Sequence, residues 1–413
     1  MRSAQRAVRP YSYSFESLIE SARTAIDHLG NPEPVLGYVQ TMSISLKEII
    51  DSYDPEAPLE EASTIPASWY VNDDVYEAEQ QTVFSNSWQV VGRVDQVRGP
   101  GEFITREVAG EPLLIVRGED KTLRGFYNVC RHHAAAVLTA EEGRAGNLRC
   151  PYHGWTYSLE GDLKGAPDMG GICNFDRSTM GLMPVETAVW NNWVFVRLER
   201  DSLSLKSYLG EELADHVERL SHDKLVWVAR RRYELKCNWK VFVDNYLDGG
   251  YHVPHLHKGL DTVLDYSEYS IETGGRFCLQ SSPMTAVGAD SETGTVRQGK
   301  RALYYWIYPN FMINWYEGMM DTNLVCPLGV DRTEVIFDFY FKDDSVAARQ
   351  HNLASMEVSD RIQNEDLAIC ESVQRGLNSR AYNAGRLSVR REAGEHLFHK
   401  LLYHDLKAGC GRG

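Results

Sequence analysis

The spacing of apolar residues first becomes regular near residue 68. Residues 71–85 carry apolar side chains at helical spacing, and Asn72 and Asp74 supply polar groups that can cap a helix. Short apolar runs then alternate with glycine-containing turns, which is typical of hairpin strands. The predicted strands are residues 88–91, 101–108, 112–116, 122–128 and a closing run at 190–198. This stretch therefore predicts a β-rich unit that ends near Leu198.

The pattern becomes mixed after about residue 203. Helices are predicted at 237–249 and 346–377, and strands at 266–272, 302–308, 312–316, 323–327 and 333–342. Ahead of the β-rich unit lie helical patches at 15–29 and 44–53 and a Pro- and Glu-rich linker at 55–66. We therefore predict an α+β protein with an N-terminal extension (1–67), a β-rich domain with a leading helix (68–198) and a mixed domain (199–413).

Composition and charge exclude two broad classes. The chain has 413 residues, of which 43% are hydrophobic, but no apolar run approaches the length of a membrane span. The formal net charge is −15, and no window concentrates Lys and Arg without interleaved acids. We therefore predict neither a membrane segment nor nucleic-acid binding.

The cysteines and the first residues bear on location. The eight cysteines are widely separated and show no paired framework, which favours a reducing compartment. The first fifteen residues contain Arg2, Arg6 and Arg9 but no acid, which faintly resembles an organelle transit peptide. We expect an irregular, solvated N-terminus and a bacterial cytoplasmic protein, with the plastid stroma as the alternative.

One motif carries a strong metal-binding signal. Cys130-Arg-His132 is followed, after seventeen residues, by Cys150-Pro-Tyr-His153-Gly-Trp155. Zinc sites more often pair cysteine with cysteine at a short spacing, whereas each short pair here is mixed. One mixed pair on each of two loops suits a [2Fe–2S] cluster in which two cysteines hold one iron and two histidines the other. The predicted ligands are Cys130, His132, Cys150 and His153, and a zinc ribbon is the alternative.

These residues resemble a Rieske domain over residues 127–157. A Rieske protein that only carries electrons in a respiratory complex would have an extra cysteine in each loop, and this sequence has none at those places. The resemblance implies a Rieske [2Fe–2S] cluster. A non-catalytic electron carrier would need nothing beyond this cluster, and a zinc-stabilised binding protein would not react with O2.

The mixed domain contains a second candidate metal site. His252 and His257 are five residues apart with Pro254 between them, so a bent backbone can turn both onto one metal. A carboxylate would complete the two-histidine, one-carboxylate set that leaves positions open for O2 on Fe(II). The best candidate is Asp366 on the predicted C-terminal helix, with Glu365 as the fallback.

The two motifs together resemble the catalytic subunit of Rieske non-heme iron oxygenases, from about residue 68 onward. The resemblance selects His252 and His257 over the rival His255, and it implies a helix-grip (START-like) antiparallel sheet flanked by helices. In this family an acidic residue three places before the first iron histidine bridges it to a cluster histidine of a neighbouring subunit. Here that position is Gly249, so Asp248, or else Asp244, is the expected bridge.

The resemblance also implies the electron supply and the assembly. Because no G-x-G-x-x-G follows a predicted strand, no nucleotide-binding domain is visible, and NAD(P)H electrons are expected through a separate flavin and iron–sulfur reductase. Electron transfer between subunits implies a head-to-tail homotrimer.

The motif Asp-Asn-Tyr-Leu-Asp-Gly-Gly-Tyr-His-Val-Pro and the aromatic segment 304–316 resemble the choline monooxygenase branch. That branch and its bacterial relatives oxidise quaternary ammonium compounds, and such cations bind aromatic faces. We expect Trp306, Tyr308 and Tyr316, together with Asn245, to bind the substrate, although such aromatics are also ordinary core residues of a sheet.

A betaine carries a carboxylate that needs a donor, and the aromatic segment itself offers no obvious arginine. We nevertheless expect oxidative N-demethylation of a betaine such as proline betaine, with release of formaldehyde. Choline hydroxylation to betaine aldehyde is the alternative, followed by aromatic-ring dioxygenation.

Overall fold

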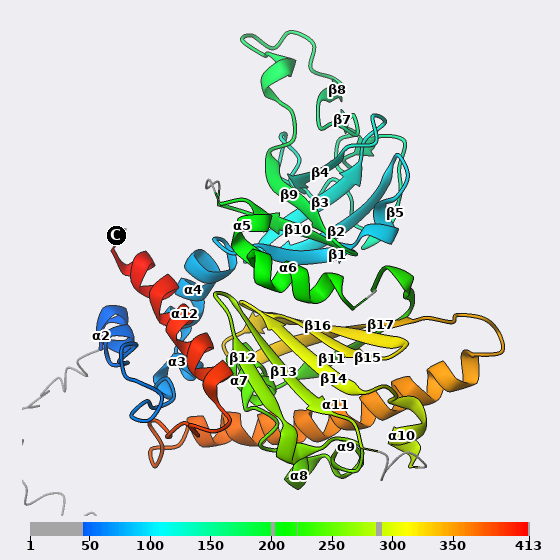
Figure 1. Cartoon of the computed structure of the whole chain (residues 1–413). Coiled ribbons are helices and arrows are strands. Elements are labelled where there is room, and N and C mark those ends of the chain that lie inside the picture. Colours follow the sequence, from blue (N-terminus) through cyan, green and yellow to red (C-terminus); the bar gives the residue numbers. More distant parts are fainter. Residues whose placement is uncertain (1–43, 200–202, 221, 286–290, 412–413) are drawn as a thin grey trace, which may run out of the picture. The chain divides into compact units, whose positions relative to one another are not determined.

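The computed structural model describes residues 44–199, 203–220, 222–285 and 291–411. All of these residues except Ile44 belong to the unit Ser45–Gly413. Figure 1 shows the ribbon of this unit. The helical patch expected at 15–29 and the basic stretch at the N-terminus lie outside the described residues.

Short helical elements precede the first strand. They are α2 (Leu46–Asp51), α3 (Ser68–Val71), α4 (Asp73–Glu79) and the π-helical turn η1 (Gln80–Phe84). The side chain of Asn72 accepts hydrogen bonds from the backbone N–H groups of Asp74 and Val75, which caps α4. The helix predicted at 71–85 is therefore present as two consecutive elements.

Part of the predicted N-terminal extension belongs to the folded core. Ile49, Ile50 and Tyr53 are buried in the main hydrophobic cluster, and the Trp69 indole N–H donates to the Ile49 carbonyl at 3.0 Å. An apolar side chain buried in this way is removed from water, so this segment contributes to stability. The predicted boundaries after residues 67 and 198 stay predictions.

The β-rich domain is built on one antiparallel sheet in the order β1-β10-β9-β4-β3-β2-β5. Its strands are β1 (Gln89–Arg93), β2 (Glu102–Val108), β3 (Glu111–Arg117), β4 (Leu123–Tyr127), β5 (Glu142–Arg144), β9 (Pro184–Trp190) and β10 (Trp193–Arg197). A smaller sheet contains β6 (Leu148–Arg149), β7 (Thr156–Tyr157) and β8 (Leu163–Gly165). The closing run predicted at 190–198 is instead the end of one strand, a turn and a second strand, because Asn191 adopts a positive φ of 53° there.

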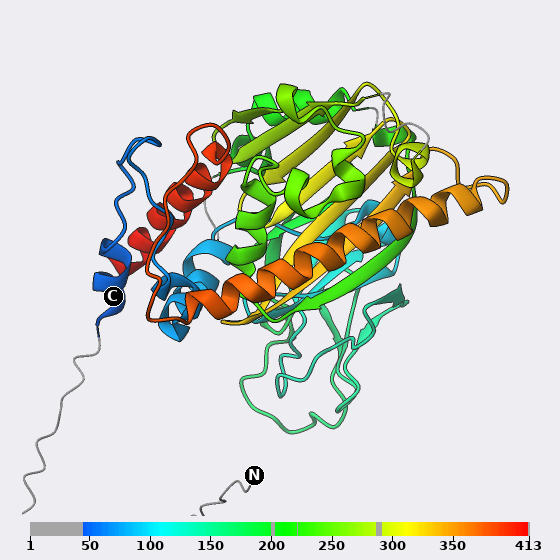
Figure 2. The ribbon, with the colours of Figure 1, turned by 90° about the horizontal axis from the view of Figure 1, so that it is seen from below.

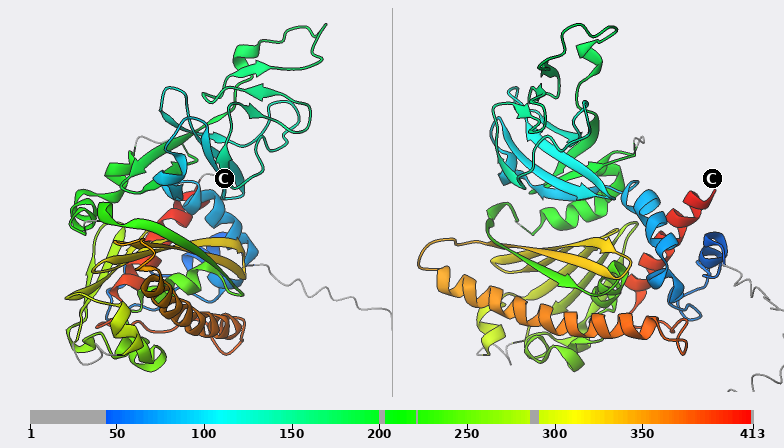
Figure 3. Two further views of the ribbon diagram at one scale, coloured as in Figure 1. Left: turned by 90° about the vertical axis from the view of Figure 1, so that its right-hand side faces the viewer. Right: turned by 180° about the vertical axis from the view of Figure 1, so that it is seen from behind.

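The second domain is an antiparallel sheet in the order β11-β17-β16-β15-β14-β13-β12. Its strands are β11 (Val226–Leu235), β12 (Ser270–Thr273), β13 (Phe277–Pro283), β14 (Arg301–Ile307), β15 (Phe311–Tyr316), β16 (Met319–Gly329) and β17 (Arg332–Phe341). The long helix α11 (Arg349–Leu377) runs across one face beside α7 (Trp239–Leu247), as Figure 2 shows. The helices α5 (Leu205–Leu209) and α6 (Glu211–Glu218) lie between the two sheets in Figure 3. This arrangement is the predicted α+β fold with an antiparallel sheet flanked by helices.

The elements that the sequence pattern missed have polar or irregular faces. β11 carries three consecutive arginines and lies at the sheet edge, and β13 carries Gln280, Ser281 and Ser282. Neither shows the alternation of a half-buried strand. The strand predicted at 266–272 begins as a 3-10 turn and becomes β12 only at Ser270. The helix α12 (Ala393–Cys410) was also not predicted.

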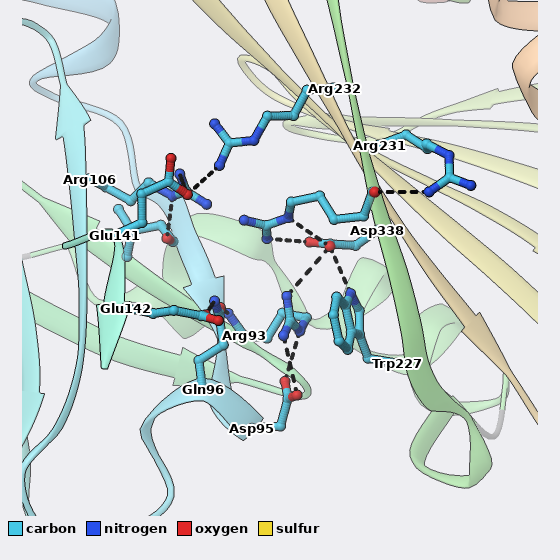
Figure 4. A network of polar contacts seen from close by, with 12 residues as sticks. Arg93, Asp95, Gln96, Arg106, Glu141, Glu142, Trp227, Arg231, Arg232 and Asp338 are labelled. Atoms are coloured by element: carbon cyan, nitrogen blue, oxygen red, sulfur yellow. Dashed lines mark hydrogen bonds and ion pairs between the residues drawn. The ribbon is translucent and has the colours of Figure 1, made fainter. Parts of the chain in front are cut away.

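A polar network joins the two sheets, and Figure 4 shows it from close by. The carboxylate of Asp338 on β17 accepts from Arg230 at 2.7 and 2.9 Å and from the Trp227 indole at 2.9 Å. Arg93 on β1 lies 3.5 Å from the same carboxylate and bonds Asp95 at 2.9 Å. One buried acid therefore fixes strands of both domains against each other, since breaking a buried charge network is costly.

Among the described helices, none is both long and apolar enough to cross a membrane.

Candidate active site

The two loops that carry the Cys-x-His and Cys-x-x-His pairs have the same backbone frame. The N–H of Cys130 donates to the carbonyl of Ala135, and that of Cys150 to the carbonyl of Trp155, each at 2.8 Å. The fourth residue after each cysteine returns a hydrogen bond to the cysteine carbonyl, at 3.0 and 3.1 Å, from a left-handed backbone conformation. Both thiols are buried, with 3% and 2% exposure. The loops therefore present equivalent cysteines from opposite sides.

The imidazoles of the two loops lie together. The rings of His132 and His153 are 4.8 Å apart, and His132 stacks on Trp155 with an interplanar angle of 5°. Nδ1 of His132 is buried and has no hydrogen-bond partner among the described residues, so it is available to a metal. Its neighbour His133 also lies 4.0 Å away, ring to ring, but is exposed.

The donor geometry fits two irons better than one zinc. Ligand atoms of His132, His133 and His153 lie within 4.8 Å of one another, but neither cysteine belongs to that group among the described residues. A single tetrahedral ion would draw all four donors into one group, whereas a [2Fe–2S] cluster keeps thiolates and imidazoles on separate irons.

The Tyr157 hydroxyl lies 3.3 Å from the Cys130 sulfur, and it accepts from the Arg131 N–H at 2.9 Å.

The second group begins where α7 ends. Gly249 and Gly250 both adopt a φ of +67°, which turns the chain into the one-turn helix α8 (Val253–Leu256). A Cβ at position 249 would also clash with the carbonyl oxygen of Arg391, so this position cannot hold the acidic side chain that the family resemblance expects there. Pro254 lies in the first turn of α8, where a proline is compatible with a helix.

The structure brings His252, His257 and Asp366 together. Nε2 of His257 lies 3.1 Å, and Nε2 of His252 lies 3.8 Å, from Oδ1 of Asp366 on α11. That oxygen is buried and lacks a hydrogen-bond partner among the described residues. A shared carboxylate oxygen with two converging ring nitrogens fits a divalent metal. The rival His255 is exposed.

Each imidazole of this group is held from behind by a second carboxylate. Asp248 Oδ2 lies 2.5 Å from Nδ1 of His252, and Glu365 Oε2 lies 2.7 Å from Nδ1 of His257. Such contacts fix the ring orientation and leave Nε2 free for a metal. Glu365, the fallback candidate for the carboxylate, therefore holds the His257 ring in place instead of pointing at the shared centre.

The electrostatics favour a positive charge at this point. Burial alone would lower the pKa of His257, but hydrogen bonding and attraction from Asp366 and Glu365 outweigh it and raise the pKa. A divalent metal ion would meet the same field, because the three carboxylates of Asp248, Glu365 and Asp366 lie near the two rings.

A cavity of about 120 Å³ opens beside this group. Its lining includes polar and aromatic side chains. Among them are Asn245, Tyr246, Tyr269, Gln280, Arg297, Tyr304, Asn314, Tyr316, Asp321 and Asn323. Burial raises the pKa of Tyr246, Tyr269 and Tyr304 well above the ordinary tyrosine value, so these hydroxyls stay protonated. The cavity therefore offers neutral aromatic faces beside a metal-binding group.

Trp306 and Tyr308, which were expected to bind the substrate, do not line this cavity. Trp306 packs on Phe398 with ring centroids 5.5 Å apart, and Tyr308 donates to Asp405 of α12 at 2.7 Å. Tyr304 lies two residues before Trp306, on the same face of β14, and does line the cavity. Of the expected substrate residues, Asn245 and Tyr316 do line it.

Sequence reasoning missed Tyr269, Gln280 and Arg297. The first lies in the stretch predicted as one strand and the second in an unpredicted strand, so neither had a face assigned. Arg297 stands at the end of the short helix α10 (Glu292–Val296), just outside the aromatic segment. No local pattern marks it, and only tertiary packing places it in the cavity.

Asp244, the alternative bridge, lies in a different group. It accepts from the Tyr70 hydroxyl at 2.5 Å and lies 3.0 Å from Nε2 of His399 on α12. Of the two expected bridging acids, Asp248 is therefore the one that contacts His252.

The comparisons with known proteins now define the class. The profile of the Rieske [2Fe-2S] domain matches residues 87–176, and that of the ring hydroxylating alpha subunit (catalytic domain) matches residues 222–406. The chain is 42% identical to the choline monooxygenase of Arabidopsis thaliana over 377 residues, which cover 88% of this chain and 87% of that protein. The chain therefore belongs to the Rieske non-heme iron oxygenases.

Further relatives show which members of this family the chain resembles. The carnitine monooxygenase oxygenase subunit of Escherichia coli K12 is 32% identical, over 84% of this chain and 95% of that protein. The structure of the quaternary ammonium Rieske monooxygenase CntA with L-carnitine aligns with a TM-score of 0.73 at 29% identity, covering 84% of this chain and 96% of that one. A naphthalene 1,2-dioxygenase from Rhodococcus shares the fold, with a TM-score of 0.71 at 22% identity.

These findings confirm the predicted class of enzyme and its cofactors. The protein is an O2-dependent oxidoreductase whose Rieske domain carries a [2Fe–2S] cluster and whose catalytic domain carries a mononuclear iron.

Proposed function

We propose that this oxygenase removes an N-methyl group from a betaine such as proline betaine. The observation that carries the proposal is the tyrosine-lined cavity beside His252, His257 and Asp366. Cation–π attraction between a desolvated quaternary ammonium group and such faces is worth about 2 kcal/mol. Two relatives, named for choline and carnitine oxidation, act on compounds with this group.

We assign the mononuclear iron to His252, His257 and Asp366, and the cluster to Cys130, His132, Cys150 and His153. The orphaned Asp366 oxygen and the orphaned His132 nitrogen support both assignments. When bound, the iron supplies O2 activation, and the cluster supplies electrons. The chain's own part is to hold the imidazoles through Asp248 and Glu365 and to hold the ammonium group beside them.

The overall chemistry balances with two external electrons. One N-methyl C–H, O2, two electrons and two protons give N–CH2OH and water. The C–N bond of that hydroxymethyl compound then breaks, releasing formaldehyde, the tertiary amine and a proton. A separate flavin and iron–sulfur reductase fed by NAD(P)H supplies the electrons in this proposal.

We further propose a homotrimer in which Asp248 connects His252 to a cluster histidine of a neighbouring subunit. The 2.5 Å contact supports it, as do the exposed His153 and the 63% exposed Tyr152 at the edge of the cluster loops. Electron transfer between subunits has also been described for CntA. Mixing Asp366→Ala with Cys150→Ser subunits should restore activity that neither homotrimer has, and no restoration would contradict the bridge.

Choline hydroxylation is the second candidate, because the 42% identical relative carries that name. A bacterial cytoplasmic location stays a prediction, since the plant relatives are chloroplastic and residues 1–43 lie outside the described part.

The test measures formaldehyde release and O2 uptake with the reconstituted enzyme and a reductase. The substrates are proline betaine, glycine betaine, carnitine and choline, and Asp366→Ala is the blank. Stoichiometric formaldehyde from a betaine supports the proposal, whereas O2 uptake on choline without formaldehyde indicates hydroxylation. No turnover of any of the four by protein loaded with both metal centres would overturn the quaternary-ammonium assignment.

A further inference from the structure

Two buried side chains of opposite charge line the cavity, and neither is directly ion-paired. Arg297 and Asp321 are each 3% exposed. Among the described residues, no carboxylate lies within 4.0 Å of the Arg297 guanidinium, and no basic group lies within 4.0 Å of the Asp321 carboxylate. A buried charge without an ionic partner is expensive, so each of them indicates a missing counter-charge.

Neutral groups hold the guanidinium in place. Nη1 of Arg297 donates to the Ser355 hydroxyl, and Nη2 donates to the Ser355 carbonyl at 3.2 Å and to the Ser359 hydroxyl at 2.6 Å. Its central carbon lies 5.0 Å from the centre of the Tyr316 ring. These three hydrogen bonds use three of five N–H groups and neutralise no charge. The planar guanidinium of Arg297 is therefore held in one orientation, and its positive charge remains available to a ligand.

The carboxylate of Asp321 is held in the same manner. It accepts from the side-chain amides of Asn314 at 2.7 Å and Asn323 at 3.2 Å. Burial raises its pKa, whereas Arg297 and the two amides work in the opposite direction. Asp321 and Arg297 attract each other without forming a direct ion pair.

The distance along α11 fits a compact ligand. Ser359, which holds Arg297, and Asp366 at the iron site are seven residues apart, so they share one helix face about 10 Å apart. A short zwitterion with its carboxylate at Arg297 can extend an N-methyl group toward His252 and His257.

We propose that Arg297 is the receptor for the substrate carboxylate and that Asp321 faces the quaternary ammonium group. The inference rests on the proposed function and narrows it to zwitterions. Arg297 matches a carboxylate because its planar fork can donate two parallel hydrogen bonds. Choline would leave this buried cation without a partner. The substrate class is therefore betaines, not choline.

Matched ligand pairs test the assignment. Proline betaine and N,N-dimethylprolinolium differ only in carboxylate against hydroxymethyl, as do glycine betaine and choline. The reconstituted trimeric enzyme should prefer the carboxylate member of each pair in kcat/KM. Arg297→Gln should lower kcat/KM for the betaines by about 10- to 100-fold, the range of a lost charge-assisted bond, and leave the alcohols unchanged.

Two further variants separate the roles. Arg361→Gln is the matched control, because Arg361 is an exposed arginine of α11 whose ion pair among the described residues is with Glu292 of α10. It should change neither ligand of a pair. Asp321→Asn should weaken both members equally, since both carry the ammonium group. Arg297→Lys should retain part of the preference, because it keeps the charge and loses the fork.

The outcomes distinguish this inference from the proposed function. An equal loss for betaine and alcohol in Arg297→Gln, or a wild-type preference for the alcohols, overturns the carboxylate receptor while quaternary ammonium oxidation stands. Inertness of the wild type on all four ligands overturns both. Should Arg297→Gln lose its cluster absorption, Arg297→Lys and Ser359→Ala make the same comparison, and an unchanged pair ratio in both overturns the inference.

Discussion

Two groups of histidine and carboxylate in the catalytic domain have nearly the same spacing. At the iron site, ring nitrogens lie 3.1 and 3.8 Å from Asp366. In the second group, Nε2 of His399 lies 3.0 Å from Asp244 and 3.9 Å from Glu395. The donor atoms of each group lie within 4.8 Å of one another. Spacing alone does not distinguish them.

Their surroundings do. The first group opens onto the cavity and has a carboxylate behind each imidazole, whereas the second is closed between α7 and α12, where the Tyr70 hydroxyl donates to Asp244. Nδ1 of His399 is buried without a hydrogen-bond partner among the described residues, so no acid holds the ring from that side. Access and an outer layer of carboxylates, not composition, make a catalytic metal site. The second group instead fastens α12 to the helix that leads into the active site.

Asp366→Ala breaks the first group and should have the largest effect. It removes the shared ligand oxygen, so iron content should fall and substrate oxidation should drop more than about 1,000-fold. The visible spectrum of the Rieske cluster should be unchanged. Iron analysis and O2 uptake check this against Glu357→Ala, an exposed acid of the same helix. Full iron occupancy in Asp366→Ala would contradict the assignment.

Asp244→Ala breaks the second group and should affect stability instead. It leaves His399 and Tyr70 without their acceptor, which costs about 2–3 kcal/mol of unfolding free energy. Thermal unfolding should show a lower Tm with both metal centres still loaded. A large loss of iron with unchanged Tm would mean that the two groups are not independent.

Glu365→Gln tests the outer carboxylate layer. The amide removes the charge that holds Nδ1 of His257, so iron affinity should weaken by about 10- to 100-fold. Competition with a chelator measures this affinity. Unaltered affinity would show that the outer acid is not required, and the contrast between the two groups would then rest on cavity access alone.

Glu395→Gln should have the smallest effect, and only above acidic pH. Burial, then repulsion from Asp244, Glu392 and Asp248, raises the pKa of Glu395 well above its usual value. Its folded pKa exceeds the unfolded one, so its stability contribution is complete below about pH 4.5 and is lost as pH rises through the folded value.

In Glu395→Gln the side chain is a neutral amide, so the protein does not lose stability as pH rises through the folded pKa of Glu395. Glu395→Gln should therefore have a higher Tm than the wild type at pH 8, with the gap closing toward pH 5. His399 and Tyr70 contact the same group of acids. The same Tm measurements on Asp244→Ala are therefore needed to assign the change in Tm to Glu395. A constant gap at all pH values would exclude ionisation of Glu395 as its cause.

The local part of the site was readable from the sequence because its donors are close in the chain. Within each cluster loop the cysteine and histidine are separated by one or two residues, and the hydrogen-bonded turns are local. The histidines at 252 and 257 likewise share one bend that two glycines allow. Asp366 was the best candidate for the carboxylate, but it is 109 residues beyond His257, and no spacing rule connects the two.

What the sequence by itself determined is therefore the α+β class, the family and the candidate metal donors within each loop, because short spacing limits which side chains can converge. Tertiary structure decided which aromatics line the cavity. Trp306 and Tyr304 are two residues apart on one strand, yet a bulky helix partner, Phe398, covers the first and the cavity receives the second. It also decided that Arg297 and Asp321 line that cavity together, since their positions depend on how α10, α11 and β16 pack and not on any local pattern.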